Sequence, residues 1–341
     1  MKSNEELCMP CSQPQSRMLS PLVEFVCISC AAQEPMLERS VTPSSTGAKC
    51  LVCASCQQDY PVRNGIPRFV DAHNYSSSFG FQWKKYSKTQ LDSHASVTLS
   101  RQRLFEATGW AADMSGQLIL EAGSGAGRFT ECLLNTGARV VSFDSSIAVE
   151  SNLLNNGDSD RLQLFQADIH RIPLRAGSVD KVLCLGVLQH TPRPEESFKS
   201  LAKMPRRGGE LVIDIYRKDL LALLQWKYLL RPITRRMDSR VLHKIVSSVV
   251  PPLLPLAKTL RRLGGRAGAR LVPIVEYSHL GLSAEANKEW AILDTFDMYS
   301  PAYDYPQSGR TLLRWFTDAG FDNVEIRRGP NGLIGKGRRS H

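Results

Sequence analysis

Residues 118–130 read LILEAGSGAGRFT, and this stretch decides the fold. A short apolar run, Leu118–Ala122, leads into a Gly-x-Gly-x-Gly turn and then into a helical pattern. Glycines at a strand-to-helix turn let the backbone approach a ligand closely and start the helix tightly. A dinucleotide-binding turn would have its third glycine at position 128, where this chain has Arg128. The turn therefore predicts a parallel α/β domain whose ligand is neither NAD nor FAD.

Further apolar runs alternate with helical patterns on the carboxyl side of this turn. Strands separated by helical crossovers indicate a parallel sheet with helices on both faces. Two final runs flank Gly329-Pro330-Asn331-Gly332 and predict a hairpin at the edge of that sheet. We therefore expect an α/β fold with a doubly wound, mostly parallel, seven-stranded sheet. The strands expected after the first are residues 139–143, 162–166, 179–185, 210–216, 324–328 and 333–336.

Three carboxylates stand at the carboxyl ends of the first three strands, where open α/β sheets bind ligands. Glu121 precedes the glycines, where it would repel a pyrophosphate and favour a cofactor with positive charge. Asp144 ends the second strand and can accept hydrogen bonds from both hydroxyls of a ribose. Asp168 ends the third strand and can accept a hydrogen bond from an adenine amine, with Ile169 packing on the ring. The alternative is an ordinary tight turn with Asp144 and Asp168 as helix caps.

Five motifs in sequence order resemble those of class I S-adenosylmethionine-dependent methyltransferases of the type 11-like group. After LILEAGSGAGRFT come VVSFDSS (140–146), FQADIHRIPL (165–174), DKVLCLGVLQHTPRP (180–194) and PRRGGELVIDIY (205–216). The resemblance implies a Rossmann-like methyltransferase fold that uses S-adenosyl-L-methionine as cofactor. It implies that Glu121 and the three glycines wrap the methionine end, that Asp144 holds the ribose, and that Asp168 with Ile169 holds the adenine. The full set of expected cofactor contacts is Glu121, Gly123, Gly125, Gly127, Asp144, Ser145, Asp168, Ile169 and Leu185.

Cysteines gather near the start of the chain, where seven of the nine fall in the first 56 residues. No signal peptide precedes them, so we expect a cytoplasmic protein in which paired cysteines bind metal before they form disulfides. Three Cys-x-x-Cys pairs and one additional cysteine are present. Two such pairs about 15–20 residues apart are typical of a tetrahedral thiolate zinc site. The seven residues are Cys8, Cys11, Cys27, Cys30, Cys50, Cys53 and Cys56.

Residues 52–70, VCASCQQDYPVRNGIPRFV, resemble the second knuckle of a Trm112-like zinc ribbon. This resemblance implies that Cys27, Cys30, Cys53 and Cys56 hold a structural Zn²⁺. The additional Cys8, Cys11 and Cys50 leave a different pairing or a second metal open, and reduced cysteines without metal are the plainer alternative. Four thiolates satisfy Zn²⁺ completely, so this metal would stabilise the fold and take no part in catalysis.

Charge and composition divide the chain into five parts. They are a cysteine-rich segment (1–72), a helical connector over the cofactor (73–112), the cofactor-binding core (113–216), a basic helical insertion (217–290) and the completion of the core (291–341). The formal charge is +10, and residues 217–275 hold thirteen Lys/Arg against two Asp/Glu, which is 13 − 2 = +11. Such a segment attracts anions locally. No apolar run approaches the ~18 residues that span a bilayer, so we expect no integral membrane association.

His190 is the first candidate for a general base, because it follows the fourth strand and titrates near neutrality. Weaker candidates are His170, Tyr216, Asp297 and Tyr299. We expect methyl transfer by in-line displacement to a small-molecule, sugar or secondary-metabolite acceptor, most often at oxygen, whose anionic groups would pair with the basic insertion. Two alternatives stay open. One is an RNA methyltransferase that uses the zinc ribbon and the insertion, and the other is a non-catalytic partner protein that binds the cofactor.

Overall fold

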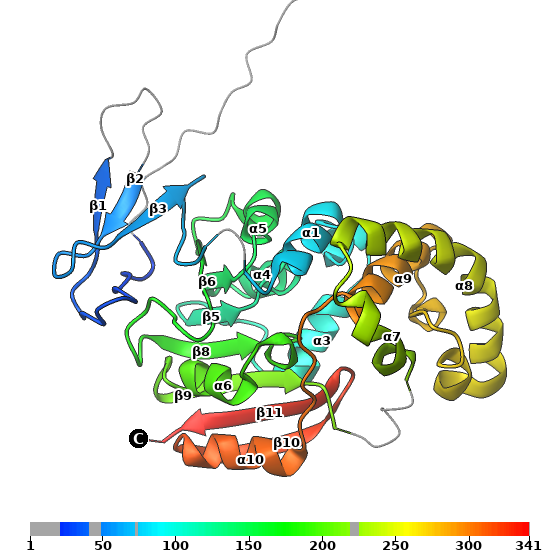
Figure 1. Ribbon diagram of the computed structural model, residues 1–341. Coiled ribbons are helices and arrows are strands. Elements are labelled where there is room, and N and C mark those ends of the chain that lie inside the picture. The colour runs from blue at the N-terminus through cyan, green and yellow to red at the C-terminus, as the bar shows by residue number, and fades with distance from the viewer. Residues whose placement is uncertain (1–20, 41–48, 72–73, 219–224, 341) are drawn as a thin grey trace, which may run out of the picture.

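The computed structural model describes residues 21–40, 49–71, 74–218 and 225–340. Near the amino end, a separate small antiparallel sheet runs in the order β1-β2-β3-β4 and lies beside the edge of the larger sheet (Figure 1). Its strands are β1 (Leu37–Ser40), β2 (Lys49–Val52), β3 (Asp59–Arg63) and β4 (Ile66–Pro67). Cys8 and Cys11 lie outside the described residues.

The larger sheet confirms the expected doubly wound, seven-stranded architecture, with the strand order β10-β11-β9-β8-β5-β6-β7. Strands β5 to β9 pair in parallel, and β11 pairs antiparallel with both β9 and β10. The predicted hairpin is present, because Gly329 and Gly332 pair across its turn. Its strands, like β9, are longer than expected. The strands are β5 (Leu118–Ala122), β6 (Arg139–Asp144), β7 (Leu162–Gln166), β8 (Val179–Cys184), β9 (Pro205–Ile215), β10 (Phe321–Gly329) and β11 (Gly332–Arg339).

Alternation along the parallel strands builds a separate core on each face of the sheet. In β5, Leu118 and Leu120 join one hydrophobic cluster, whereas Ile119 joins the other. Helices α3 (Leu99–Thr108) and α4 (Arg128–Leu134) pack on the Ile119 face, and α6 (Pro194–Ala202) and α10 (Gly309–Asp318) pack on the opposite face. Helix α5 (Val149–Asn156) packs against β7. The sheet is therefore buried on both sides, as parallel sheets are.

A helical layer covers one end of the sheet, on the side away from the small sheet (Figure 1). Its helices share one hydrophobic cluster, in which Leu242, Val250 and Phe296 are buried. The elements of this layer and its connections are α1 (Ser77–Lys85), α2 (Asp92–Ala95), α7 (Trp226–Thr234), α8 (Ser239–Ala269), α9 (Ala284–Tyr299) and the 3₁₀ turns Leu188–His190 and Ser278–Leu280. Of the helices in the described ranges, none combines the length and the hydropathy that crossing a bilayer requires.

The small sheet shares its hydrophobic core with the large one. Phe25 and Phe69 from the amino-terminal segment pack against Phe165 of β7, with ring centroids 5.3 Å and 6.2 Å from the Phe165 ring. Phe69 N–H donates to the carbonyl of Gln166 at 2.8 Å, and the buried Arg68 donates to the Gln166 side chain at 3.0 Å. These contacts attach the cysteine-rich segment to the edge strand of the large sheet.

This shared aromatic core generates a stability prediction. Phe69→Ala removes a buried ring that contacts three other aromatic side chains, so we expect a loss of about 3–5 kcal/mol in the free energy of unfolding. Urea denaturation of the purified chain measures this loss. Leu37→Ala is the control, because Leu37 is 62% exposed and its truncation should cost less than about 0.5 kcal/mol. Equal costs for the two variants would contradict a shared core.

Candidate functional site

A cavity with a volume of about 1010 Å³ opens at the carboxyl ends of β5, β6, β7 and β8. One wall comes from the loops that follow these strands. The opposite wall comes from helices α1, α3, α8 and α9, which contribute residues far apart in the sequence. The expected carboxyl edge is therefore the floor of a cavity whose other wall the helical layer supplies.

The glycine turn lies against this cavity through two of its three glycines. Gly123 and Gly125 line the wall, with φ angles of 76° and 53° that favour glycine. A Cβ atom on Gly125 would stand 3.0 Å from the Trp83 ring, so the turn and helix α1 approach each other closely. Gly127 faces away from the cavity, where a Cβ atom would stand 2.2 Å from Asn152 Oδ1. Gly127 therefore serves the packing of the turn on helix α5.

Asp144 ends β6 and lines the cavity, as the sequence predicts. Its Oδ2 accepts a hydrogen bond from Gly125 N–H at 3.0 Å, and its Oδ1 accepts one from Ser146 N–H at 2.8 Å. Burial raises the pKa of this carboxyl above its ordinary value, although the backbone donors oppose the shift. A buried acceptor is thus fixed between the glycine turn and the end of β6.

Glu121 is not among the residues that line the cavity and lies behind its wall. Its carboxylate accepts hydrogen bonds from Thr130 of α4 and from Ser142 of β6, the latter at 2.9 Å. The strand register explains this direction, because Glu121 pairs with Ser142 across β5 and β6. Burial raises the pKa of Glu121 to about 7. Its negative charge is therefore unfavourable in the fold.

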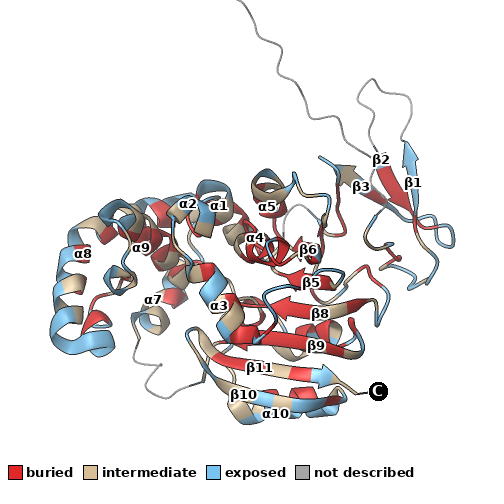
Figure 2. Cartoon of the chain, turned by 180° about the vertical axis from the view of Figure 1, so that it is seen from behind, coloured by how far each residue is buried: buried red, intermediate tan, exposed pale blue. Residues whose placement is uncertain are grey.

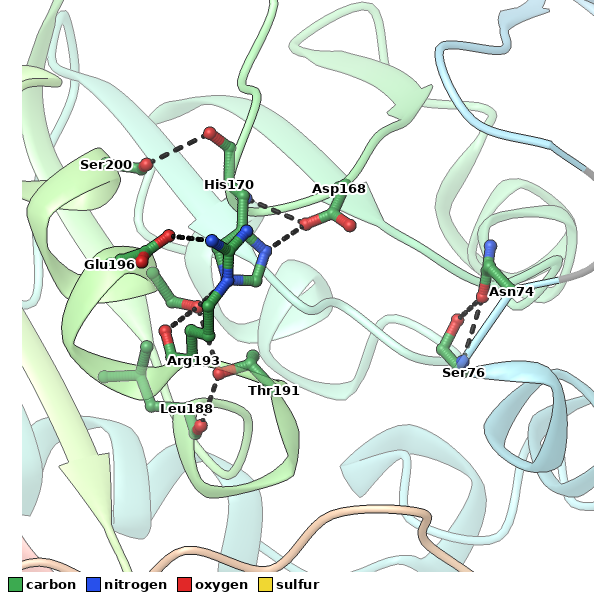
Figure 3. A network of polar contacts seen from close by, with 10 residues as sticks. Asn74, Ser76, Asp168, His170, Leu188, Thr191, Arg193, Glu196 and Ser200 are labelled. Carbon is green, nitrogen blue, oxygen red and sulfur yellow. Dashed lines mark hydrogen bonds and ion pairs between the residues drawn. The ribbon is translucent and has the colours of Figure 1, made fainter.

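Asp168, which the sequence predicts to hold the adenine, makes a local contact with His170. Figure 3 shows its carboxylate directed at His170, whose Nδ1 lies 2.6 Å from Asp168 Oδ1. The His170 backbone N–H donates to the same oxygen at 2.8 Å. These hydrogen bonds hold the pKa of Asp168 below its ordinary value although burial opposes them. The cavity wall at this point comes from the neighbouring Ala167 and Ile169.

The other residues expected at the cofactor site, Ser145 and Leu185, do line the cavity. His190 lines it too, and its Nδ1–H donates to the carbonyl of Tyr303 at 3.0 Å. Burial lowers the pKa of His190 to about 4, so the imidazole is neutral at pH 7. Of the weaker candidates for a base, Tyr216 and Asp297 line the cavity, whereas His170 and Tyr299 do not.

Helix α9 brings a second pair of carboxylates into the wall, and only Asp297 of that pair was singled out from the sequence. Asp294 accepts hydrogen bonds from the Tyr277 hydroxyl and from Gln90 Nε2, the latter at 3.2 Å. Burial and the neighbouring Asp294 charge raise the pKa of Asp297 to about 7, with a hydrogen bond from Gln82 opposing the shift. The sequence signal for Asp294 was a carboxyl among the buried apolar residues of α9. Its position in the cavity wall depends on how α9 packs, so it became visible only in three dimensions.

Two partly buried arginines add positive charge to the same wall. Arg103 forms an ion pair with Asp214 at 2.7 Å. Arg128 donates to Gln90 Oε1 at 2.5 Å and to Ser100 Oγ at 3.1 Å, and in the described part of the chain these hydrogen-bond partners are neutral. Burial lowers the pKa of Arg128 to about 10, so it stays charged at pH 7.

Four cysteines of the small sheet and its loops converge in space. The sulfur atoms of Cys27, Cys30, Cys53 and Cys56 lie within 4.8 Å of one another, with Cys27 3.6 Å from Cys56 and Cys30 3.6 Å from Cys53. Tetrahedral zinc with Zn–S bonds of about 2.3 Å separates its sulfur ligands by about 3.8 Å, so this arrangement fits the ion. Cys50 lies outside the cluster, with its sulfur 3.6 Å from the carbonyl of Arg39.

The sheet order and the pocket at its carboxyl edge define a Rossmann-like α/β domain. Residues 120–213 match the family model of the methyltransferase domain. This match spans less than a third of the chain, and it contains the loops that follow the four strands of the cavity floor.

Curated relatives match a similar part of the chain. An uncharacterised protein of Synechococcus is 32% identical over 115 residues, which span 32% of this chain and 28% of that protein. The ubiquinone biosynthesis O-methyltransferase of Coxiella burnetii is 27% identical over 113 residues, spanning 33% of this chain and 48% of that enzyme. The matched stretch thus spans about half or less of the length of these relatives.

Solved structures resemble the chain at low identity. Human N-acetylserotonin methyltransferase in complex with S-adenosylmethionine is similar with a TM-score of 0.39 and 13% identity, over 79% of this chain and 57% of that one. A chain of the complex between the Haloferax volcanii Trm112 methyltransferase activator and a methyltransferase is similar with a TM-score of 0.44 and 13% identity, over 77% and 98% of the two chains.

The buried Glu121 predicts a pH-dependent stability. Its pKa is raised from 4.5 to about 7 in the folded chain, so the folded state binds the proton more tightly than the unfolded state. Stability should therefore fall as pH rises from 4.5 to 7, by up to about 3 kcal/mol in total. Glu121→Gln keeps an acceptor without the charge. Urea denaturation across this pH range should show the natural chain losing stability relative to the variant. If the free energies of unfolding of the natural chain and the variant change in parallel with pH, Glu121 does not have the raised pKa.

Proposed function

We propose that the chain is an S-adenosylmethionine-dependent methyltransferase that methylates a small-molecule acceptor, most favourably at oxygen. The observation that carries this proposal is the coincidence of the matched methyltransferase segment with the floor of the cavity. The loops after four parallel strands, all within that segment, face the helical layer across one cavity. A cavity of about 1010 Å³ can hold a cofactor and an acceptor together.

The residues of the cavity fit the proposed cofactor. Asp144 would accept hydrogen bonds from the ribose hydroxyls, and Ile169 with Leu185 would pack on the adenine. The glycine turn brings backbone close to the ligand at Gly125. Two buried polar atoms of the wall, Ser124 Oγ and Gln82 Oε1, have no hydrogen-bond partner among the described residues. A bound ligand would satisfy both, because buried polar groups are costly without a partner.

In this proposal, Glu121 and Gly127 hold the glycine turn in place without lining the cavity. Glu121 ties β5 to β6 and to helix α4, and Gly127 lets the turn pack on helix α5. Asp168 would act at the rim, because its side chain is about one-third exposed and is held by His170. When bound, the cofactor supplies an electrophilic methyl group on its sulfonium. The chain then has to align the acceptor and exclude water.

Asp297 and His190 are the two wall residues that we propose to contact the acceptor, one as the general base and the other as a positioning residue. Asp297 suits the general base better, because a carboxyl whose pKa is about 7 is half ionised at neutral pH and still basic. His190 would position the acceptor through its unprotonated Nε2, since its Nδ1–H is engaged by Tyr303. Because burial lowers its pKa to about 4, it is a weaker base than Asp297.

The acceptor we propose is a small molecule with an anionic group. Arg128 is a partly buried cation that lines the cavity and has neutral hydrogen-bond partners, so it can pair with a carboxylate or phosphate of the acceptor. The names of several relatives, ubiquinone biosynthesis O-methyltransferases, favour oxygen as the atom methylated. The cavity volume of about 1010 Å³ can hold a small acceptor beside the cofactor.

A methyl-transfer screen tests the proposed function. Purified protein with methyl-labelled S-adenosylmethionine is incubated with fractionated cell extract, with and without ribonuclease. We expect label in a low-molecular-mass fraction that ribonuclease leaves unchanged. Label that ribonuclease abolishes would establish the RNA alternative instead. Cofactor binding without transfer to any fraction would favour the non-catalytic partner protein.

With that acceptor in hand, Asp297→Asn and His190→Asn separate the two proposed roles. Asp297→Asn should lower kcat by about 10²-fold or more and remove the rise of rate with pH near 7, because it removes the base. His190→Asn should raise KM for the acceptor and lower kcat by less than about tenfold. Cofactor affinity, measured by calorimetry, should stay unchanged in both variants. The reverse order of effects on kcat would assign the base to His190.

We also propose that Cys27, Cys30, Cys53 and Cys56 bind a structural Zn²⁺, on the strength of their sulfur separations. Cys27 and Cys53 belong to the same hydrophobic cluster as Phe165, so loss of the ion should loosen the attachment of the small sheet. The ion would lie in the small sheet's loops, apart from the cavity, because none of the four cysteines lines it.

Metal analysis with matched variants tests the zinc site. Cys30→Ala with Cys56→Ala should remove the equivalent of one zinc ion per chain and lower Tm by several degrees. Cys50→Ala is the control and should keep the metal content of the natural chain, because Cys50 lies outside the cluster. Equal zinc loss in the control would overturn the assignment. A natural chain that keeps its Tm after the zinc has been removed would also overturn it.

A further inference from the structure

Helix α8 has two apolar faces, and the fold buries only one of them. Leu242, Val246, Val250, Leu254 and Ala257 are buried in the cluster that α8 shares with α9. A second set of apolar residues is between 40% and 81% exposed, and we call it the exposed stripe: Val241, Ile245, Val249, Leu256 and Leu263. Figure 2 shows α8 at the outer rim of the molecule, with exposed residues along its length.

The exposed stripe is one continuous line on the helix surface. At 100° per residue, its five side chains fall within an arc of about 80°, and the buried set falls within the arc beside it. Pro252 lies in the same arc and is also exposed. Scattered apolar residues are ordinary on protein surfaces, but a contiguous line six turns long is typical of an interaction surface.

The charges of α8 point to the kind of surface that covers this stripe. The helix holds Arg240, Lys244, Lys258, Arg261, Arg262 and Arg266 and has no Asp or Glu between Ser239 and Ala269. Arg240, Lys244, Lys258 and Arg262 all flank the stripe on its side away from the buried face. An apolar line bordered by cations is the pattern of a helix that lies in the interface of an anionic membrane.

An exposed aromatic side chain contacts the segment that follows α8, beyond the kink at Gly264 and Gly265. Trp226 of α7 is partly exposed, and its indole N–H donates to the carbonyl of Leu271 at 3.2 Å. Leu271 follows α8 and is itself 66% exposed. Tryptophan is favoured at the level of lipid headgroups, where its ring is apolar and its N–H is polar.

Two other occupants fit these observations less well. A second copy of the chain would bring two cationic, acid-free helices together, which like-charge repulsion disfavours. A nucleic acid would pair with the arginines and lysines but would leave five aliphatic side chains against a polar backbone.

We propose that helix α8, through Val241, Ile245, Val249, Leu256, Leu263 and the cations beside them, docks the protein on the surface of an anionic lipid bilayer. The apolar side chains enter the headgroup region while the lysines and arginines contact anionic headgroups. The helix lies on the bilayer and does not cross it. This inference is independent of the proposed methyl transfer, because it uses no residue of the cofactor site.

Vesicle co-sedimentation of the zinc-loaded full chain tests the proposal without cofactor or acceptor. We expect binding to phosphatidylcholine vesicles containing phosphatidylglycerol, weaker binding at high salt, and little binding to phosphatidylcholine alone. Ile245→Glu with Leu256→Glu should lower the partition coefficient by about tenfold or more. Lys244→Glu with Arg262→Glu should lower it on anionic vesicles by a similar factor. Because all four side chains are exposed or partly exposed, the variants should keep the Tm of the natural chain.

Leu313→Glu on α10 is the matched control, because Leu313 is as exposed as Ile245 but lies on another helix. It should leave vesicle binding unchanged. Equal loss in this control, or no binding of the natural chain to anionic vesicles, would overturn the proposal. So would a dimer in solution that Ile245→Glu with Leu256→Glu dissociates, or RNA binding that the same pair abolishes, since each would give the stripe another occupant.

Discussion

The site depends on the hydrogen bonds that Asp144 accepts from Gly125 N–H and Ser146 N–H. These bonds join the turn after β5 to the end of β6, so two loops from neighbouring parallel strands become one wall. A parallel sheet makes this possible because its strand ends meet at a single edge. Burial of Asp144 raises its pKa, and only fixed backbone donors keep such a carboxylate ready to accept further hydrogen bonds.

Around that edge, the chain assembles its cavity from segments with different roles. The sheet supplies the floor and the glycine turn, and α9 supplies Asp294 and Asp297 from more than a hundred residues further along the chain. The cysteine-rich segment packs on β7 through Phe25 and Phe69. A metal bound there would act on the core through this packing and would have no direct contact with the cavity. Helix α8 contributes to the cavity wall and also presents a separate apolar line to the outside.

The strands of the large sheet could be predicted from the sequence because apolar runs and glycine turns are local signals. The side-chain directions of Glu121 and Asp168 could not. Both faces of a parallel sheet are buried, so alternation along β5 could not show what Glu121 contacts. The strand register places Glu121 beside Ser142 of β6. Asp168 contacts His170, two residues on, and this local contact was not visible in the sequence pattern. Asp294 became part of the site only through the packing of α9, which no local pattern specifies.

Isothermal titration of the zinc-loaded full chain with S-adenosylmethionine is the most direct measurement of the cavity's role. We predict binding at a single site, weakened about tenfold or more in Asp144→Ala because charge-assisted hydrogen bonds to the ribose are lost. Asp158→Ala, at an exposed position after α5, should bind as the natural chain does. No heat of binding from the folded natural chain, or unchanged affinity in Asp144→Ala, would contradict the assignment of this cavity to the cofactor.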